Sequence, residues 1–181
     1  METQVINSFF RECLSLPWKP NSQDNPEHEN QVEELLIKHG LKYVAQPNGI
    51  QNSPDFYVFH NGKQYSVECK SSKGHHPTYN GGLPKPGSIY IFSSKKYNKT
   101  TVYFADDVVK KSKRELFSCL IEEINDVLKK YQSLPEWQND ERGFNFYIRN
   151  MFTQSGGRAK TDYFEHKDKT ICEESVLNAV Y

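Results

Sequence analysis

Two acidic residues and one lysine in the first half of the chain could together carry out hydrolytic chemistry. Asp55 and Glu68 are separated by twelve residues, and Lys70 follows Glu68 two positions later. Two carboxylates held close together repel each other unless a cation lies between them, and a hard divalent ion such as Mg²⁺ prefers such oxygen ligands. A bound ion can hold a phosphate oxygen and lower the pKa of a coordinated water, while a lysine can orient that water or help to deprotonate it. These residue types therefore suit hydrolysis of a phosphodiester bond.

The chain around these residues has the pattern of a tight β-hairpin. Asp55–His60 and Lys63–Lys70 contain the aromatic and β-branched residues typical of strands, and Asn61-Gly62 separates them. An Asn-Gly pair between two such runs is the strongest short signal for a two-residue hairpin turn, because both turn positions need a positive φ. We therefore expect the two acidic residues on neighbouring strands of one hairpin.

The turn also determines which residues face each other. Counting outwards from it places Asp55 opposite Glu68, where Cβ atoms on one face of a sheet lie about 4.5–5.5 Å apart. Lys70 points to the same face because strand side chains alternate, whereas Cys69 points into the core. A surface hairpin with an ordinary Glu68–Lys70 ion pair is the alternative interpretation. The Pro54 that precedes Asp55, and the basic run that starts at Lys70, weigh against that alternative.

The segments 53–55 (Ser-Pro-Asp) and 68–70 (Glu-Cys-Lys) resemble the motif of the PD-(D/E)XK nuclease superfamily, which includes type II restriction endonucleases, junction resolvases and repair nucleases. The resemblance implies an α/β fold with a restriction-endonuclease-like core, a mixed β-sheet flanked by helices. It implies catalytic roles for the two acidic residues and the lysine. It also implies a metal site of Asp55, Glu68 and Cys69 that holds Mg²⁺, with Mn²⁺ as a substitute.

The same resemblance implies a further catalytic carboxylate on the helix that precedes the sheet. Counting back eleven positions from Gly40, the expected end of that helix, gives Glu29, and Glu33 lies one turn further on. An acidic residue in a first helical turn is also favoured by the helix dipole, which is the alternative explanation for Glu29. Glu29 is the candidate, and Glu33 is the fallback.

Helical and strand patterns alternate along the rest of the chain, as in α/β proteins. Helical patterns occupy residues 4–15, 27–39, 106–131 and 172–179, and further strand patterns occupy 42–45, 88–93, 100–104 and 144–152. We expect one domain over 1–181, with an N-terminal helix at 4–15, a catalytic core at 27–152, an insert at 73–105 and a C-terminal tail at 153–181. The long helix 106–131 and the strand 144–152 are assigned to the superfamily core.

Charge is unevenly distributed along the chain, although the formal net charge is zero. Residues 70–114 carry ten basic and two acidic residues, whereas the segments before and after each have a net charge of −4. A solvated lysine-rich face would explain this block, but the block begins inside the motif, where phosphate groups would bind. The predicted DNA contacts lie in this block and in the polar tail: Ser71, Ser72, Lys73, His75, His76, Tyr79, Asn80, Lys85, Lys95, Lys96, Arg158 and Lys160.

Composition narrows the class of protein. A hydrophobic fraction of 36% with 13% aromatic residues indicates a folded globular chain. No apolar run approaches the roughly 18 residues of a membrane span, and the N-terminus lacks the basic region of a signal peptide. The four cysteines have no CxxC spacing, which argues against a zinc site or a disulfide framework. We expect a cytoplasmic protein with no membrane partner.

The favoured function is a Mg²⁺-dependent endonuclease that hydrolyses double-stranded DNA at a specific sequence, as type II restriction enzymes do. A palindromic target would imply a homodimer with one active site for each strand. A structure-selective nuclease of the resolvase or repair type is the first alternative, although such proteins tend to be smaller or more basic. A non-catalytic DNA-binding module with the same fold is the second, and the presence of all three motif residues argues against it.

Overall fold

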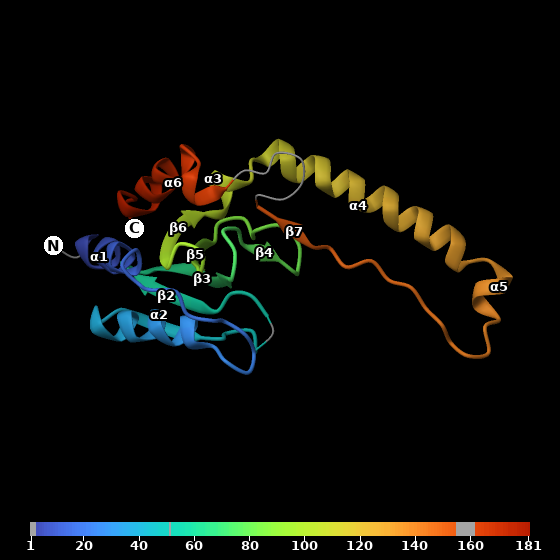
Figure 1. Cartoon of the computed structure of the whole chain (residues 1–181), viewed down its shortest axis with the longest axis horizontal. Coiled ribbons are helices and arrows are strands. Elements are labelled where there is room, and N and C mark those ends of the chain that lie inside the picture. The colour runs from blue at the N-terminus through green and yellow to red at the C-terminus, as the bar shows by residue number, and fades with distance from the viewer. Residues whose placement is uncertain (1–2, 51, 155–161) are drawn as a thin grey trace.

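The centre of the computed structural model, which describes residues 3–50, 52–154 and 162–181, is a five-stranded mixed sheet (Figure 1). Its strands follow the spatial order β1-β2-β3-β5-β6. Neighbours are antiparallel except β3 and β5, which run parallel. The strands are β1 (Lys42–Ala45), β2 (Phe56–His60), β3 (Lys63–Ser72), β5 (Ile89–Ser94) and β6 (Lys99–Phe104).

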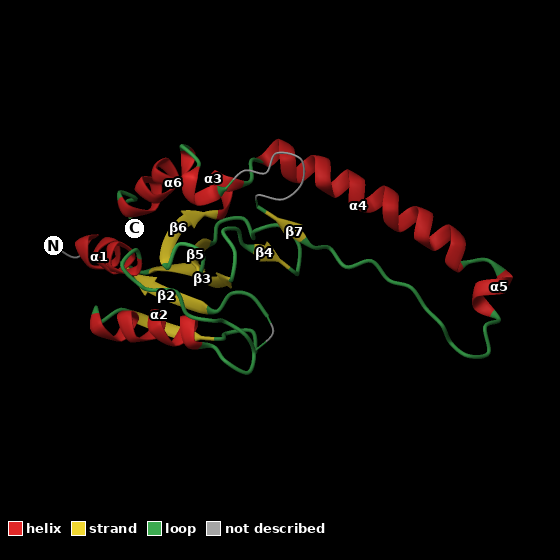
Figure 2. Cartoon of the chain, viewed as in Figure 1, coloured by secondary structure: helices red, strands yellow, loops and turns green. Residues whose placement is uncertain are grey.

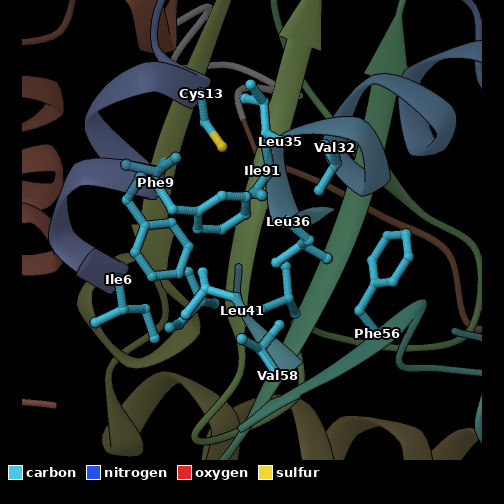
Figure 3. Close-up of a cluster of buried hydrophobic side chains, with 14 of the residues drawn as sticks. Ile6, Phe9, Cys13, Val32, Leu35, Leu36, Leu41, Phe56, Val58 and Ile91 are labelled. Atoms are coloured by element: carbon cyan, nitrogen blue, oxygen red, sulfur yellow. The ribbon is translucent and has the colours of Figure 1, made fainter. Parts of the chain in front are cut away.

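Three helices pack against this sheet: α1 (Thr3–Cys13), α2 (Glu27–Lys38) and α6 (Asp168–Leu177). In α2 the apolar residues Val32, Leu35 and Leu36 have the i, i+3, i+4 spacing of one helical face, and all three are buried. They meet buried residues of α1 and of the strands in one apolar cluster, which Figure 3 shows around Phe9, Leu36 and Ile91. Burial of these apolar side chains, at about 1.5–3 kcal/mol each, is the main force holding the layers together.

A second, smaller layer covers the other face of β5 and β6. The short strands β4 (Thr78–Tyr79) and β7 (Phe152–Thr153) form a two-stranded antiparallel sheet, and the 3-10 turn η2 (Tyr163–Glu165) lies close by. The aromatic rings of Tyr79, Tyr90 and Tyr103 are buried in this layer. Since β5 has apolar clusters on both faces, all of its residues are buried.

A long excursion leaves the compact part of the molecule. After α3 (Ala105–Val108) the chain enters α4 (Lys111–Gln132), passes through α5 (Pro135–Gln138) and returns without regular structure before β7. Figure 2 shows α4 projecting away from the sheet, with the returning segment beside it as a loop. No residue of α4 is buried. We call residues 111–151 the arm and the other described residues the body.

The structure confirms the predicted hairpin. Asn61 and Gly62 have φ values of 49° and 73°, as the two-residue turn requires. Phe56 pairs with Val67 in the β2–β3 ladder, so the predicted register is correct, and Asp55 lies one position beyond the last pair. The strand predicted at 42–45 is β1, and Gly40 ends α2 with a φ of +65°.

The structure differs from the predicted assignment of elements in two places. The segment 73–105 is more than an insert, because its strands β5 and β6 complete the central sheet. The helix predicted at 106–131 breaks where Val109 and Lys110 adopt extended backbone, and its long part lies in the arm. The helix that packs on β6 is α6, which begins four residues before the predicted 172–179.

The strand predicted at 144–152 is also wrong as a core element. Only Phe152–Thr153 forms a strand, and it pairs with β4 outside the central sheet. Residues 144–151 contain the aromatic and β-branched side chains typical of strands, but they have no ladder partner in the described chain. The α/β class and the mixed sheet flanked by helices are nevertheless as expected.

Candidate active site

The β2–β3 hairpin and the turn before it form a hydrogen-bonded polar cluster. Glu68 Oε1 accepts a hydrogen bond from Lys70 Nζ at 2.7 Å, and Glu68 Oε2 accepts one from Ser53 Oγ at 2.8 Å. Asp55 Oδ2 accepts a hydrogen bond from the main-chain N–H of Cys69 at 2.6 Å. The predicted trio is therefore gathered at one end of the hairpin, and Glu68 is almost completely buried.

Asp55 is surrounded by more negative charge than the nearby lysine offsets. Burial, the charge of Glu68 and the charge of Glu29 raise the pKa of Asp55 from its ordinary 3.8 to about 7, although the N–H of Cys69 and the charge of Lys70 oppose the shift. A carboxyl group whose pKa is raised in this way lacks a sufficient counter-charge in its charged form. A divalent cation at this position would supply it.

Lys70 is held in its protonated form. Burial alone would lower the pKa of Lys70, but the charge of Glu68, the hydrogen bond to Glu68 and the charge of Asp55 outweigh burial, and the pKa is raised. A protonated ammonium donates hydrogen bonds and has no acceptor site. This geometry favours a role for Lys70 in orienting groups and stabilising negative charge over a role as a base.

The acidic residue that joins this cluster from α2 is Glu29 and not the fallback Glu33. Glu29 contributes to the raised pKa of Asp55, and its carboxylate accepts a hydrogen bond from Asn21 Nδ2 at 2.8 Å. Asn21 Oδ1 in turn accepts from the Glu29 N–H at 3.2 Å, so the pair fixes the first turn of the helix. Glu33 instead accepts a hydrogen bond from Tyr43 Oη at 2.8 Å on β1.

The residues present fit a magnesium ion better than a softer metal. Among residues 3–50, 52–154 and 162–181, no three His, Cys, Asp or Glu side chains gather in an arrangement that could hold a metal. Mg²⁺ does not require such a cage, because it keeps several waters and is commonly bound by one or two carboxylates; Asp55 and Glu68 are the carboxylates that would hold it. The thiol of Cys69 does not suit the predicted metal contact, since it is buried in the core and burial raises the thiol pKa.

The cluster opens into a polar cavity of about 540 Å³. Glu68 and Lys70 line it from β3, the segment 78–83 lines it from the loop around β4, and Arg149 lines it from the arm. Asp55 is not a lining residue, but it bonds to the main chain of Cys69, which is one. The volume lies within the roughly 300–1,000 Å³ of pockets that bind small molecules or parts of larger ones.

Some of the predicted DNA-contact residues line this cavity: Ser71, Ser72, Tyr79, Asn80 and Lys85. Tyr79 is nevertheless a packing residue, because its ring is buried and its hydroxyl lies 2.7 Å from the hydroxyl of Tyr103. Others are not among the lining residues: Lys73, His75, His76, Lys95 and Lys96. Arg158 and Lys160 lie outside the described residues.

Several of the predicted contacts outside the cavity have other partners. Lys96 forms a 2.8 Å ion pair with Asp162, and His75 Nδ1 lies 3.9 Å from the same carboxylate. The ammonium of Lys95 lies 5.0 Å from the centre of the Trp18 ring. These side chains hold the β5–β6 turn and the loop after β3 against neighbouring segments.

Sequence reasoning missed nine of the residues that line the cavity, among them Ser53, Asn21, Tyr90 and Arg149. Ser53 precedes Pro54 directly, so its position next to the motif was the available signal. Asn21 lies in a loop, and Tyr90 reaches the site through the parallel pairing of Glu68 with Tyr90 in β3 and β5. Nothing in the local sequence indicates that Arg149 folds back from the arm.

No protein-family model, curated protein sequence or solved structure matches this chain. The helices among the described residues include none with the length and apolar character needed to cross a membrane.

Proposed function

We propose that this chain is a Mg²⁺-dependent endonuclease with a restriction-endonuclease-like core. The observation that carries the proposal is the arrangement of Asp55, Glu68 and Lys70 at one end of a hairpin, beside a polar cavity. The raised pKa of Asp55 supports it, because burial and the charges of Glu68 and Glu29 disfavour the charged form of Asp55, and a bound cation would favour that form. Mn²⁺, which also accepts oxygen ligands, is expected to substitute for Mg²⁺.

Each residue of the cluster has a distinct part in the proposed hydrolysis. Asp55 and Glu68 would hold the ion, which when bound activates a water and neutralises charge on the phosphate. Lys70 donates hydrogen bonds to the reacting phosphate or the attacking water and stabilises the negative charge that develops in the transition state. Ser53 keeps Glu68 oriented, and Glu29 adds negative charge beside Asp55.

The proposed substrate is double-stranded DNA cut at a specific sequence. Ser71 and Ser72 continue from the catalytic strand into the cavity and would contact the phosphate backbone, which positions DNA without reading its sequence. Asn80, Lys85 and Arg149 line the same cavity with groups that can read base edges. A palindromic site would be cut by two copies of the chain. A cytoplasmic location belongs to the same proposal, and four free cysteines suit a reducing compartment.

The test is digestion of a long sequenced DNA with the purified protein in Mg²⁺, with its Lys70→Ala variant and with EDTA. We expect discrete fragments from the wild type, a loss of about 100-fold or more in rate for Lys70→Ala, and no cleavage in EDTA. Lys63→Ala, which removes an exposed lysine from the start of the same strand, is the matched control and should cut normally.

Each alternative function gives a different result in that assay. Cleavage of branched junctions without fixed ends on linear duplex would identify a structure-selective nuclease. Equal behaviour of the wild type and Lys70→Ala, or cleavage that EDTA does not stop, would refute the proposed site. Binding to DNA with no cleavage under any divalent ion would identify a non-catalytic module.

A further inference from the structure

The exposed face of α4 carries a seven-residue repeat. Phe117, Leu120, Ile124, Val127 and Tyr131 follow one another at alternating spacings of three and four, which is the a/d pattern of a coiled coil. The outward-facing b, c and f positions of the same repeat hold only Ser, Cys, Glu, Asn, Asp, Lys and Gln. The e positions Ile121 and Leu128 are also apolar, so the apolar face of α4 is wide enough to be covered by another helix.

This apolar face is exposed to solvent and borders a groove. The four residues from Leu120 to Tyr131 in the repeat are 38–57% exposed. They line a groove of about 590 Å³ together with Trp137, Phe146 and Ile148, which follow α4 in the arm. The groove is therefore mostly apolar, and Glu123 is its charged lining residue. Phe117 is different, because its ring packs against Phe152 of β7 with centroids 5.0 Å apart and ties the base of α4 to the body.

We propose that this face binds the same face of a second copy of the chain, with the two α4 helices antiparallel. One register fills every free a and d position with an apolar partner. In it Ile124 packs beside Val127 of the second copy, and Leu120 packs beside Tyr131 of the second copy. Twofold symmetry repeats both contacts, so one face serves as its own complement.

Charge selects this antiparallel arrangement. Two antiparallel helices bring the g positions together, and in this register Glu123 meets Lys130 of the second copy twice, once on each side of the twofold axis. Parallel helices would bring g positions beside e positions, where Glu123 would face the apolar Leu128 and its charge would have no partner. The face is thus self-complementary in both apolar shape and charge only when the helices are antiparallel.

The length and direction of the arm permit this pairing. α4 has 22 residues and is roughly 33 Å long. It projects away from the sheet, so a second helix can reach it beside the body (Figure 2). The pairing does not depend on the proposed nuclease activity, but it would supply the two copies that a palindromic target requires.

The experiment is a measurement of molar mass by light scattering across protein concentration for charge-reversal variants of the full chain. The wild type should have twice the chain mass of 21.1 kDa at micromolar concentration. Glu123→Lys places like charges together twice and should raise the dimer Kd by about tenfold. The double variant Glu123→Lys with Lys130→Glu exchanges the two charges and should restore the wild-type Kd. Glu122→Lys makes the same charge change at an outward f position and should have no effect.

Two further variants test the apolar layers. Ile124→Asp places a charge in both central contacts, each of which joins residue 124 of one copy to Val127 of the other. The variant should be a monomer with an unchanged circular dichroism spectrum. Ile124→Cys with Val127→Cys, in a Cys119→Ser background, should give a disulfide-linked dimer on mild oxidation, because those positions adjoin across the interface. A wild type of monomer mass at every concentration would overturn the proposal. So would a dimer insensitive to Ile124→Asp, or a double charge swap no tighter than its single variants.

Discussion

The body and the arm contain the same kind of helix in opposite surroundings. In α2 the residues Val32, Leu35 and Leu36 form an apolar face that is buried under the sheet. In α4 the equivalent face from Leu120 to Tyr131 remains 38–57% exposed, and none of its residues is buried. An amphipathic pattern therefore predicts that a helix has a covered face, but it does not predict which surface covers it.

The same lesson applies to the two extended segments. The hairpin around Asn61-Gly62 finds its partner strand two residues away, so local sequence determines both the strand and its register. Residues 144–151 have a strand-like composition, yet only the following Phe152–Thr153 forms a ladder. A strand exists only where a partner does, and the partner of a distant segment is not specified by local pattern.

The largest expected effect concerns the chemistry of the body. Asp55→Asn removes one of the two proposed metal ligands and should reduce cleavage by about 1,000-fold or more, since both ion binding and charge stabilisation are lost. DNA binding, measured by gel shift in Ca²⁺ or EDTA, should stay equal or become tighter because a negative charge near phosphates is removed. Loss of DNA binding in a folded Asp55→Asn protein would contradict the assigned role.

A matched pair of leucines should sharpen the contrast between the two helices. Leu36→Ala in α2 creates a cavity in the core and should lower the free energy of unfolding by about 2–4 kcal/mol. Leu120→Ala in α4 removes an exposed side chain and should cost less than about 1 kcal/mol. Urea unfolding at submicromolar concentration, where pairing between copies is weak, is the measurement. Equal costs at that concentration would mean that the arm face is covered within one chain.

The pH dependence of the free energy of unfolding should reveal the raised pKa of Asp55. The pKa of Asp55 is raised to about 7 in the folded protein, so folding favours its protonated form. The contribution of Asp55 to the free energy of unfolding is fully present below its unfolded pKa of about 4. It is lost as the pH rises through 7. Without metal, the protein should lose about 1–3 kcal/mol between pH 5 and pH 8.

Asp55→Asn is the control for that pH effect, because an amide does not titrate. In this variant the free energy of unfolding should change less with pH than in the wild type. Mg²⁺ requires the deprotonated carboxyl group, so it should stabilise the wild type more at pH 8 than at pH 5. Urea unfolding in EDTA and in Mg²⁺ at both pH values measures these differences. A slope that is the same in the wild type and in Asp55→Asn would show that the loss comes from other groups.

The smallest expected effect on cleavage comes from a residue of the arm that reaches the cavity of the body. Arg149 belongs to the arm but lines the cavity of the body, and Arg149→Ala should slow cleavage by about three- to tenfold, mostly through a higher KM. Arg142→Ala, at an exposed position earlier in the returning segment, is the matched control and should leave the rate unchanged. A loss confined to kcat would instead place Arg149 in the chemical step.

The sequence was sufficient for the elements whose partners are close in the chain. The Asn61-Gly62 turn predicts the hairpin, and with it the meeting of Asp55, Glu68 and Lys70. The sequence did not predict the contacts between segments that are distant along the chain. The parallel pairing of β3 with β5 brings Tyr90 to Glu68, and the arm brings Arg149 to the same cavity. Long-range pairing depends on the packing of the whole chain, which no local pattern records.

The returning segment of the arm is also a mechanical connection. Asn150 accepts a main-chain hydrogen bond from Gly82, and Gln154 donates one to Pro77, so this segment is fastened to the loop that lines the cavity. A helix of 22 residues is stiff along its length, and its far end is a long way from that fastening (Figure 1). The returning segment therefore links the tip of the arm directly to the loop that lines the pocket with Glu68 and Lys70.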